Sequence, residues 1–318
     1  MGVRLFVHIF LIGLLSFLGF LPRLFFLAFM WPCAWGMYFS SRKLRRQAME
    51  SLGIAYGVTL SRRAKQGIAR ASFFNLFFGL AEFVYVIARP GRCLNMFRVE
   101  GLEHVKAAHA AGRGAIVGIA HFGPFAAMLV RFLYEEFTVK VVMRAPRSRA
   151  WREEFLAHSQ RFAPQPIYST PLRGCVTACF QALKDNQLLV MPVDQNYGGA
   201  GRIFVDFFGH KAGTAAGPAI YAWKTGAPLL TAFARPEEAL GGRRWTIVLE
   251  PVILDRSLPE QEAVLKATQE ITSRVESFTR RYPAQWSWMH RRWKAEPNEH
   301  DVVRAARTAC PEQPRGEI

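Results

Sequence analysis

The sequence lacks the short motifs of several common enzyme classes. It contains no G-x-S-x-G nucleophile turn, no G-x-x-x-x-G-K-[ST] phosphate loop, no G-x-G-x-x-G after an apolar run and no H-E-x-x-H zinc motif. Its five cysteines are odd in number, and no two of them form a C-x-x-C pair. These absences argue against nucleotide binding, serine hydrolysis and zinc chemistry. We therefore expect no metal site, and a reducing compartment for the main domain.

Acidic residues are also scarce. The chain has 24 Asp and Glu against 41 Lys and Arg, which gives a formal net charge of +17. Such an excess favours an anionic partner, whether nucleic acid, anionic lipid or an acidic substrate, without choosing among them. Apolar residues make up 51% of the 318 positions and aromatic residues 13%, which excludes a disordered chain and provides for a large core.

The N-terminal residues 1–40 predict a membrane anchor. Two apolar runs, 5–21 and 24–39, are separated by Pro22-Arg23, and each is at the short end of the length that spans a bilayer. A signal peptide is one alternative, but no small-residue cleavage site follows the first run. A buried hydrophobic helix pair is the other alternative. The basic block SRKLRR (41–46) predicts that this end of the anchor faces the cytoplasm.

The chain beyond the anchor predicts an α/β domain over residues 41–294 and a polar, flexible tail over 295–318. Residues 45–88 predict two helices with arginines on one side and phenylalanines on the other, which suits ordinary packing as well as contact with anionic headgroups. From about residue 112, short apolar runs alternate with helical stretches, and this alternation is typical of a mostly parallel sheet flanked by helices. We predict strands at 114–120, 139–143, 188–193, 228–235 and 245–253, and helices at 124–135, 150–162, 172–186, 214–225 and 260–281.

His121 stands between a predicted strand and a predicted helix, in the stretch GIAHFGPFAAML. Gly123-Pro124 favours a helix start directly after it, and the partial positive charge of a helix N-terminus disfavours the imidazolium. A neutral imidazole is the form that a general base requires. Arg144 and Asp194 also follow predicted strands, and the carboxyl ends of parallel strands face one crevice. A packed structural histidine is the alternative, and the placement alone leaves both interpretations open.

Two further segments combine arginine with residues that suit ligand contact. Arg202 ends the glycine-bearing loop YGGAGR, where its side chain could meet phosphate oxygens, although a simple surface turn is equally compatible with the sequence. The segment QWSWMHRRWK (285–294) interleaves tryptophans with basic residues. Beside a membrane anchor, we interpret it as tryptophans at the bilayer interface and arginines on headgroups. A core strand with a basic edge is at least as compatible with the sequence, and RNA stacking is the other alternative.

Three separated stretches, GRGAIVGIAHFG (112–123), MPVDQNYGGAGRIFVDFFGHKAGTAAGPAIYAWKTGAPLLTAF (191–233) and YPAQWSWMHRRWK (282–294), occur in this order. Together they resemble the late acyltransferases of lipid A biosynthesis, a family within the lysophospholipid acyltransferase group. The resemblance implies a glycerolipid acyltransferase-like fold and a protein of the inner membrane with its catalytic domain on the cytoplasmic side. It also implies transfer of a fatty acyl group from an acyl carrier protein or coenzyme A thioester to a glycolipid hydroxyl.

The resemblance also assigns residues and partners. It implies His121 as the general base, with the acyl thioester as co-substrate and no separate cofactor. Together with Arg202, the positions that we expect to bind substrate are Arg144, Gln195, Phe204, Phe207, Gly209 and Thr214. The expected partners are membrane lipids, an anionic glycolipid acceptor and the thioester carrier, and not nucleic acid.

The sequence departs from this family at one position. The family's histidine is followed, after four residues, by an acid, and Ala126 occupies that place here. In one alternative, another acid reaches His121, with Asp194 the first candidate and Glu135 or Glu136 behind it. Alternatively, the histidine acts without an acid or on an easier acceptor such as an amine. In the third alternative, the protein has lost its chemistry and only binds lipid.

Overall fold

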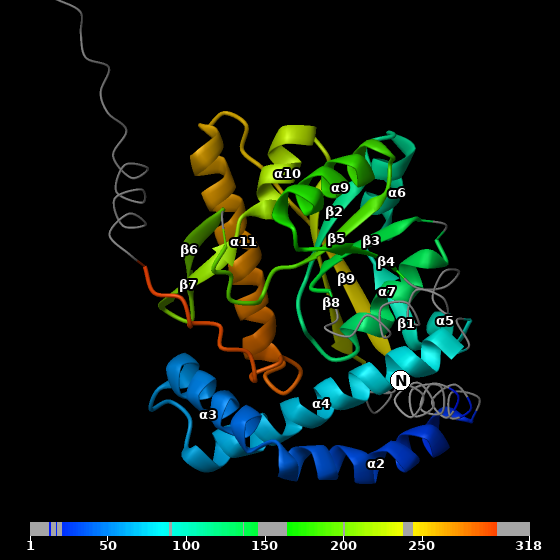
Figure 1. Cartoon of the computed structure of the whole chain (residues 1–318), viewed down its shortest axis with the longest axis vertical. Helices are drawn as coiled ribbons and strands as arrows, with labels where there is room; N and C mark the ends of the chain where they lie inside the picture. The colour runs from blue at the N-terminus through cyan, green and yellow to red at the C-terminus, as the bar shows by residue number, and fades with distance from the viewer. Residues whose placement is uncertain are drawn as a thin grey trace, which may run out of the picture.

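The computed structural model describes Gly13, Phe17 and residues 21–88, 91–135, 137–145, 164–199, 201–237 and 244–297. These residues form a seven-stranded sheet with helices on both faces and a separate two-stranded hairpin (Figure 1). The strands are β1 (Phe97–Glu100), β2 (Ala115–Ile119), β3 (Val139–Met143), β4 (Gln165–Tyr168), β5 (Leu188–Pro192), β6 (Arg202–Phe207), β7 (His210–Ala215), β8 (Leu229–Pro236) and β9 (Trp245–Val252). The helices are α2 (Arg23–Ser40), α3 (Arg42–Tyr56), α4 (Arg62–Ala88), α5 (Arg92–Met96), α6 (Leu102–Ala110), α7 (Phe125–Leu133), α9 (Leu172–Lys184), α10 (Gly217–Thr225) and α11 (Glu260–Arg281).

The seven-stranded sheet is mostly parallel, which confirms the predicted fold class. Its order is β1-β9-β8-β2-β5-β3-β4, and every neighbouring pair is parallel except β8 and β9. The central strands are uninterrupted apolar runs because helices cover both faces of the sheet. Ile116 of β2 packs in the layer that contains α9, α10 and α11, whereas its neighbour Val117 packs with α6 and α7.

The predicted strands correspond to β2, β3, β5, β8 and β9, but the short edge strands β1 and β4 and the hairpin β6–β7 were not predicted. The prediction of a helix over 214–225 was wrong at its start, because residues 210–215 form β7 and the helix begins at Gly217. Pro218 then occupies one of the first helical positions, where its missing N–H costs nothing. The helix predicted at 150–162 lies outside the described residues, as does most of the apolar run 5–21.

Helices α2, α3 and α4 form a layer along one side of the sheet domain, at the bottom of Figure 1. Helix α4 packs between α2 and α7. Helix α2 leaves bulky apolar side chains exposed: Leu24, Phe25, Phe29, Trp31, Met37 and Phe39. By length and composition, residues 62–87 of α4 could cross a membrane, and α2 with α3 would count as a second span only as one broken helix, bent by 77°. These N-terminal helices are therefore suited to membrane association, and the domain boundaries at residues 40 and 294 stay predictions.

Candidate functional site

Three polar side chains follow neighbouring parallel strands of the sheet, at the carboxyl ends of these strands. β2 and β3 both pair with β5, so His121, Arg144 and Asp194 come from adjacent strands that end on the same side. Two of them meet directly, because His121 Nδ1 lies 2.8 Å from Asp194 Oδ1. Arg144 lies exposed beyond the end of β3. The parallel arrangement thus brings His121 and Asp194 together, and the expected role of Arg144 stays a prediction.

The carboxylate of Asp194 is surrounded by hydrogen-bond donors. Besides the His121 ring, the backbone N–H of His121 donates to Oδ2 at 2.9 Å and the indole N–H of Trp286 donates to the same oxygen at 2.8 Å. The Asp194 side chain is fully buried, whereas 14% of the His121 side chain remains exposed. Asp194 is therefore a fixed inner partner, and His121 is the member of the pair that reaches the surface.

The charge state of Asp194 follows from these contacts. Burial alone would raise the pKa of its carboxyl. The charge of His121, its ring and backbone hydrogen bonds, and the charge of His290 outweigh burial and hold that pKa well below its usual range. An ionised carboxylate can only accept hydrogen bonds, so Nδ1 of His121 carries the proton and Nε2 presents its lone pair outward. This is the tautomer that a general base needs.

A chain of polar contacts continues from the His121 ring. The amide nitrogen of Gln195 lies 3.1 Å from Nε2 of His121 and 3.4 Å from Nε2 of His290. The two imidazole rings are 5.0 Å apart between centroids. Burial, together with the charge of His121, lowers the pKa of His290 to about 4, in spite of the opposing effect of Asp194. His290 is therefore neutral at neutral pH. The Nε2 atoms of His121 and His290 can both accept hydrogen bonds from the Gln195 amide.

The segment 284–295 lies against this site, and several of its side chains are internal, although Arg291 and Lys294 are exposed. Trp286, Trp288 and Arg292 are each no more than 1% exposed. The interpretation of these residues as a bilayer-interface cluster was therefore wrong. The Trp286 indole bonds to Asp194, and the Trp288 indole donates to the Pro283 carbonyl at 2.7 Å, so both find polar partners inside the protein.

Arg292 joins the site to the hairpin. Its guanidinium donates to the Gly213 carbonyl at 2.7 Å, to Thr214 Oγ1 at 2.5 Å and to the Gln195 carbonyl at 3.2 Å. Burial lowers its pKa to about 10, which still leaves a cation at neutral pH. Sequence reasoning missed both Arg292 and His290 as site residues, although both lie in the quoted stretch QWSWMHRRWK, where the tryptophans drew the interpretation toward the membrane.

Helices α3 and α4 hold this segment from the other side. Ser72 of α4 donates to the Trp286 carbonyl, Asn75 donates to the Ala284 carbonyl at 2.9 Å, and Ser51 of α3 donates to the His290 carbonyl at 3.0 Å. Gly79 of α4 packs against the backbone directly after His121, where an added Cβ would collide with the Gly123 oxygen. The helical layer that is suited to membrane association is therefore part of the site's scaffold.

Helix α7 begins next to the His121 ring. The helix begins at Phe125, one residue later than predicted, and Pro124 is its N-cap. The centroid of the Phe125 ring lies 4.5 Å from that of the imidazole. Ala126 in the first turn offers no carboxylate, while the backbone N–H groups of this turn have no intrahelical acceptor. The N–H of Gly123 is already donated to the Gln285 carbonyl at 3.0 Å.

The other acid candidates do not replace Asp194. Glu135 bonds to Arg131 at 2.7 Å and pairs with Lys106 at 3.0 Å. Glu136 lies outside the described residues. Within the described part of the chain, no three His, Cys, Asp or Glu side chains gather so that they could hold a metal ion.

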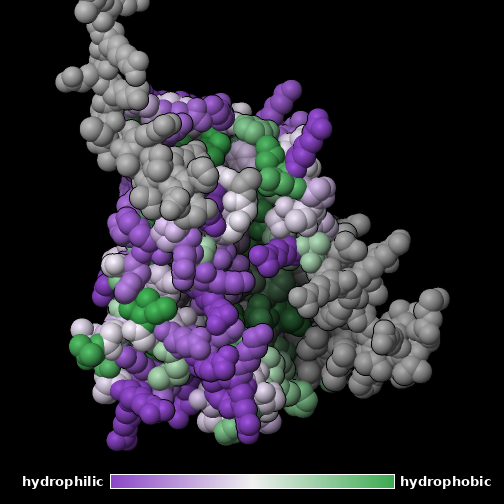
Figure 2. Space-filling view, turned by 60° about the vertical axis from the view of Figure 1, so that its left-hand side comes forward, coloured by the Kyte–Doolittle hydropathy of each residue, from purple (hydrophilic) through white to green (hydrophobic). Residues whose placement is uncertain are grey.

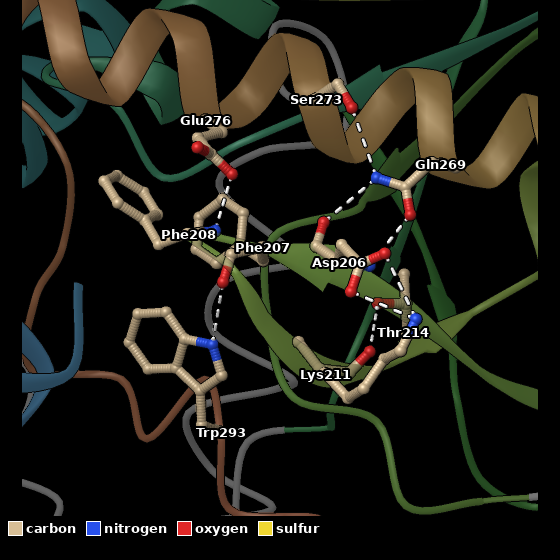
Figure 3. A network of polar contacts seen from close by, with 10 residues as sticks. Asp206, Phe207, Phe208, Lys211, Thr214, Gln269, Ser273, Glu276 and Trp293 are labelled. Atoms are coloured by element: carbon tan, nitrogen blue, oxygen red, sulfur yellow. Dashed lines mark hydrogen bonds and ion pairs between the residues drawn. The ribbon is translucent and has the colours of Figure 1, made fainter.

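The remaining predicted residues lie on the hairpin β6–β7, which Figure 3 shows tied to α11. Gln269 bonds to both backbone groups of Asp206, and Glu276 accepts from the Phe208 N–H. Gly209 and Phe208 form the two-residue turn, both with positive φ, as a primed turn requires.

Four of these residues make contacts with other side chains of the protein. Phe207 is fully buried against Trp286 and Trp293, with both ring centroids 5.5 Å away. Thr214 is buried beside Arg292. The Arg202 guanidinium lies 5.0 Å from the Phe204 ring, and both line a pocket of about 430 Å³ between the hairpin and α11.

Comparison with known proteins places these features in context. A family model described as bacterial lipid A biosynthesis acyltransferase matches residues 3–295. The chain is 26% identical over 205 residues to a phosphatidylinositol mannoside acyltransferase of Mycobacterium tuberculosis (strain CDC 1551 / Oshkosh), which covers 63% of this chain and 61% of that protein. A protein of the same name from Mycolicibacterium smegmatis is 28% identical over 216 residues, or 67% of this chain and 68% of that protein. The match to the M. tuberculosis protein thus spans less than two thirds of its length.

Proposed function

The chain belongs to the bacterial lipid A biosynthesis acyltransferase family, and on this premise we propose that it transfers a fatty acyl group from an acyl thioester to a hydroxyl of an anionic glycolipid. The pairing of His121 with Asp194 at 2.8 Å carries the proposal. It supplies an oriented imidazole with an unprotonated Nε2 at a partly exposed position, which is the group that such a transfer needs.

In the proposed reaction, His121 Nε2 removes the proton of the acceptor hydroxyl. The hydroxyl oxygen attacks the thioester carbonyl, and a new C–O bond forms. The C–S bond then breaks, and the proton passes from Nε2 to the leaving sulfur. Asp194 holds the Nδ1–H and stabilises the transient imidazolium, as the acid does in other His-based sites. The thioester is already activated, so neither a metal nor a covalent enzyme intermediate is required.

The oxyanion that develops on the carbonyl needs hydrogen-bond donors. The N–H groups in the first turn of α7, at Phe125 and Ala126, lie beside the imidazole and have no intrahelical acceptor. The Gln195 amide, 3.1 Å from Nε2, occupies the place where we propose that the acceptor hydroxyl binds. We propose that it rotates to orient the acceptor, since its side chain is exposed.

The substrate contacts are proposed from the positions around this centre. Arg144 and Arg202 suit the phosphates of the acceptor or of the donor, because a guanidinium matches phosphate oxygens. Phe204 lines the pocket beside Arg202, while Phe207, Gly209 and Thr214 shape the hairpin behind it. The donor is acyl carrier protein or coenzyme A thioester, and the acceptor is a sugar-bearing anionic lipid. The site faces the cytoplasm at the inner membrane.

A lipid-binding protein without turnover was the alternative, and it depended on the alanine at 126. Asp194, which follows another strand, supplies a carboxylate to Nδ1. The alanine at 126 therefore no longer argues against catalysis. Catalysis is therefore the better-supported function.

The test uses the full chain purified in a non-ionic detergent, with palmitoyl-coenzyme A and palmitoyl-acyl carrier protein offered as donors. A lipid A precursor and a phosphatidylinositol mannoside are offered as acceptors, and both thiol release and the acylated lipid are measured. Acceptor-dependent thiol release with one donor and one acceptor is expected. If folded protein yields no acylated lipid with any combination of donor and acceptor, the proposal is refuted.

A further inference from the structure

A basic pocket lies between the N-terminal helices, apart from the His121 site. It encloses about 620 Å³ where the end of α2 meets α3 and the first half of α4. Arg45 of α3 and Arg63 and Arg70 of α4 line it, together with the Tyr38 ring from α2. No acidic side chain is among the residues that line it.

The charge of this pocket is not neutralised by the surrounding chain. Residues 41–70 contain eight basic residues and a single acid, Glu50. Glu50 is already engaged with Arg46 at 3.3 Å and with Arg291 at 3.7 Å. Arg63 and Arg70 make no ion pair within the described residues. Guanidinium groups that share a pocket without a counter-ion call for an anion, and their fork geometry suits phosphate oxygens.

The pocket is also shaped by fixed groups. Arg45 donates to the carbonyls of Tyr38 and Phe39 at the end of α2, and its guanidinium lies 5.0 Å from the Tyr38 ring centroid. Its position is therefore set before a ligand arrives. Gly67, between Arg63 and Arg70 on α4, leaves open space, since an added Cβ there would meet nothing within 4 Å.

The surroundings distinguish a lipid from a soluble anion. The same helix that contributes Tyr38 exposes Met37 and Phe39, at 47% and 64%, beside the pocket, and Phe25 and Phe29 farther along. A basic pocket next to an exposed apolar surface matches a lipid, whose phosphate is charged and whose tails are apolar. Figure 2 shows that the lower part of the α3 side of the molecule is mostly hydrophilic, with only small hydrophobic patches.

We propose that this pocket binds the phosphate of an anionic membrane phospholipid, at a site separate from the acceptor site at His121. The bound lipid would hold α2, α3 and α4 at headgroup depth. Because α4 also supports the backbone after His121, the site would fix the depth of the catalytic centre relative to the bilayer. The inference does not require acyl transfer, and it is tested by binding alone.

The experiment measures the fluorescence anisotropy of a tail-labelled phosphatidylglycerol with the full chain in dodecyl maltoside micelles. The pair Arg63→Gln/Arg70→Gln should weaken binding about 25-fold, at about fivefold for each cation near the lipid charge. The matched control is Lys43→Gln/Arg62→Gln, which removes two positive charges from α3 and α4 outside the pocket lining, and it should change binding less than twofold. Gly67→Glu should also abolish binding, because its carboxylate can pair with Arg63 and Arg70 along the helix.

The outcomes separate the alternatives. Equal losses of binding in the Arg63/Arg70 and the Lys43/Arg62 double variants would overturn the proposal in favour of diffuse charge attraction. Displacement of the labelled lipid by coenzyme A or by acyl carrier protein, with the same dependence on Arg63 and Arg70, would overturn it in favour of a donor site. Tail-labelled phosphatidylcholine should bind all variants equally weakly, and melting temperatures should show that the variants remain folded.

Discussion

Replacing Asp194 with asparagine keeps the size of the side chain that holds His121 but removes its charge. Two of its three donors, the His121 backbone N–H and the Trp286 indole, bond to the same oxygen, Oδ2. In the variant, the amide oxygen will take that position, which turns the NH₂ group toward Nδ1. The amide then donates to Nδ1, so the ring proton moves to Nε2 and the base loses its lone pair toward the substrate.

The expected cost is large for turnover and small for binding. The same change in a serine protease triad lowers turnover about 10⁴-fold. We expect kcat of Asp194→Asn to fall about 10³- to 10⁴-fold, or about 4–5.5 kcal/mol of transition-state stabilisation. KM should change little, because Asp194 is fully buried and touches no substrate. The assay is thiol release from the acyl thioester in the presence of the glycolipid acceptor.

A matched control and a stability measurement complete this test. Asp255→Asn makes the same change at an exposed position and should leave kcat unchanged. The lowered pKa of Asp194 means that its stabilising contribution is complete above about pH 4 and is lost as the pH falls through the folded-state value. The parent should therefore lose stability below pH 4 more steeply than Asp194→Asn. A variant that retains more than a third of parental kcat would refute the proposed role of the carboxylate.

Three further substitutions test the structure around the site, and a salt wash tests the membrane attachment. His290 has a folded-state pKa of about 4, so the unfolded chain binds a proton between pH 6.5 and 4 that the folded chain does not. Stability should fall by up to about 3 kcal/mol as the pH drops through that window, and melting of His290→Gln should lack this loss. Gly79→Val should lower both melting temperature and activity because of its collision with Gly123, whereas identical melting curves would contradict the packing. Ala126→Glu should give no gain in rate, since Nδ1 is already occupied by Asp194; a tenfold gain would mean that the pair is incomplete. The protein should remain in the membrane fraction after a high-salt wash, and release into the wash would indicate attachment by charge alone.

The parallel core and the pairing of His121 with Asp194 could be predicted from sequence because both follow from local patterns. β2 and β5 are fully apolar runs, as strands covered on both faces must be, and a polar residue follows each of them after one further apolar residue. Once the strands are parallel neighbours, their ends share an edge, and the absence of an acid at Ala126 made Asp194 the first candidate.

The edge strands and the hairpin were missed for identifiable physical reasons. β1 and β4 have four residues each and lie at the two edges of the sheet, and β4 contains Pro166, which usually argues against a strand. The turn of the hairpin places Phe208 at a φ of +54°, where glycine, asparagine or aspartate would signal a turn. The hairpin therefore carried no local turn signal before the glycine at 209.

The sequence left open whether the segment 285–294 is buried, because the cause of its burial lies elsewhere in the chain. Arg292 is internal only because the carbonyls of Gln195 and Gly213 and the hydroxyl of Thr214 converge on it from about 80 to 100 residues away. Tryptophans next to arginines occur both at a membrane interface and in a buried hydrogen-bond network of this kind, so composition alone does not separate the two. Only the tertiary structure distinguishes the two.

The purified full chain and its His121→Gln variant provide the most direct comparison, with His104→Gln on the exposed face of α6 as the matched control. The rate of acyl transfer from thioester to glycolipid is measured in detergent micelles at neutral pH. The variant at 121 should be at least a thousandfold slower than the parent, with the control unchanged. Equal rates for parent and His121→Gln would contradict the imidazole as the base of this reaction.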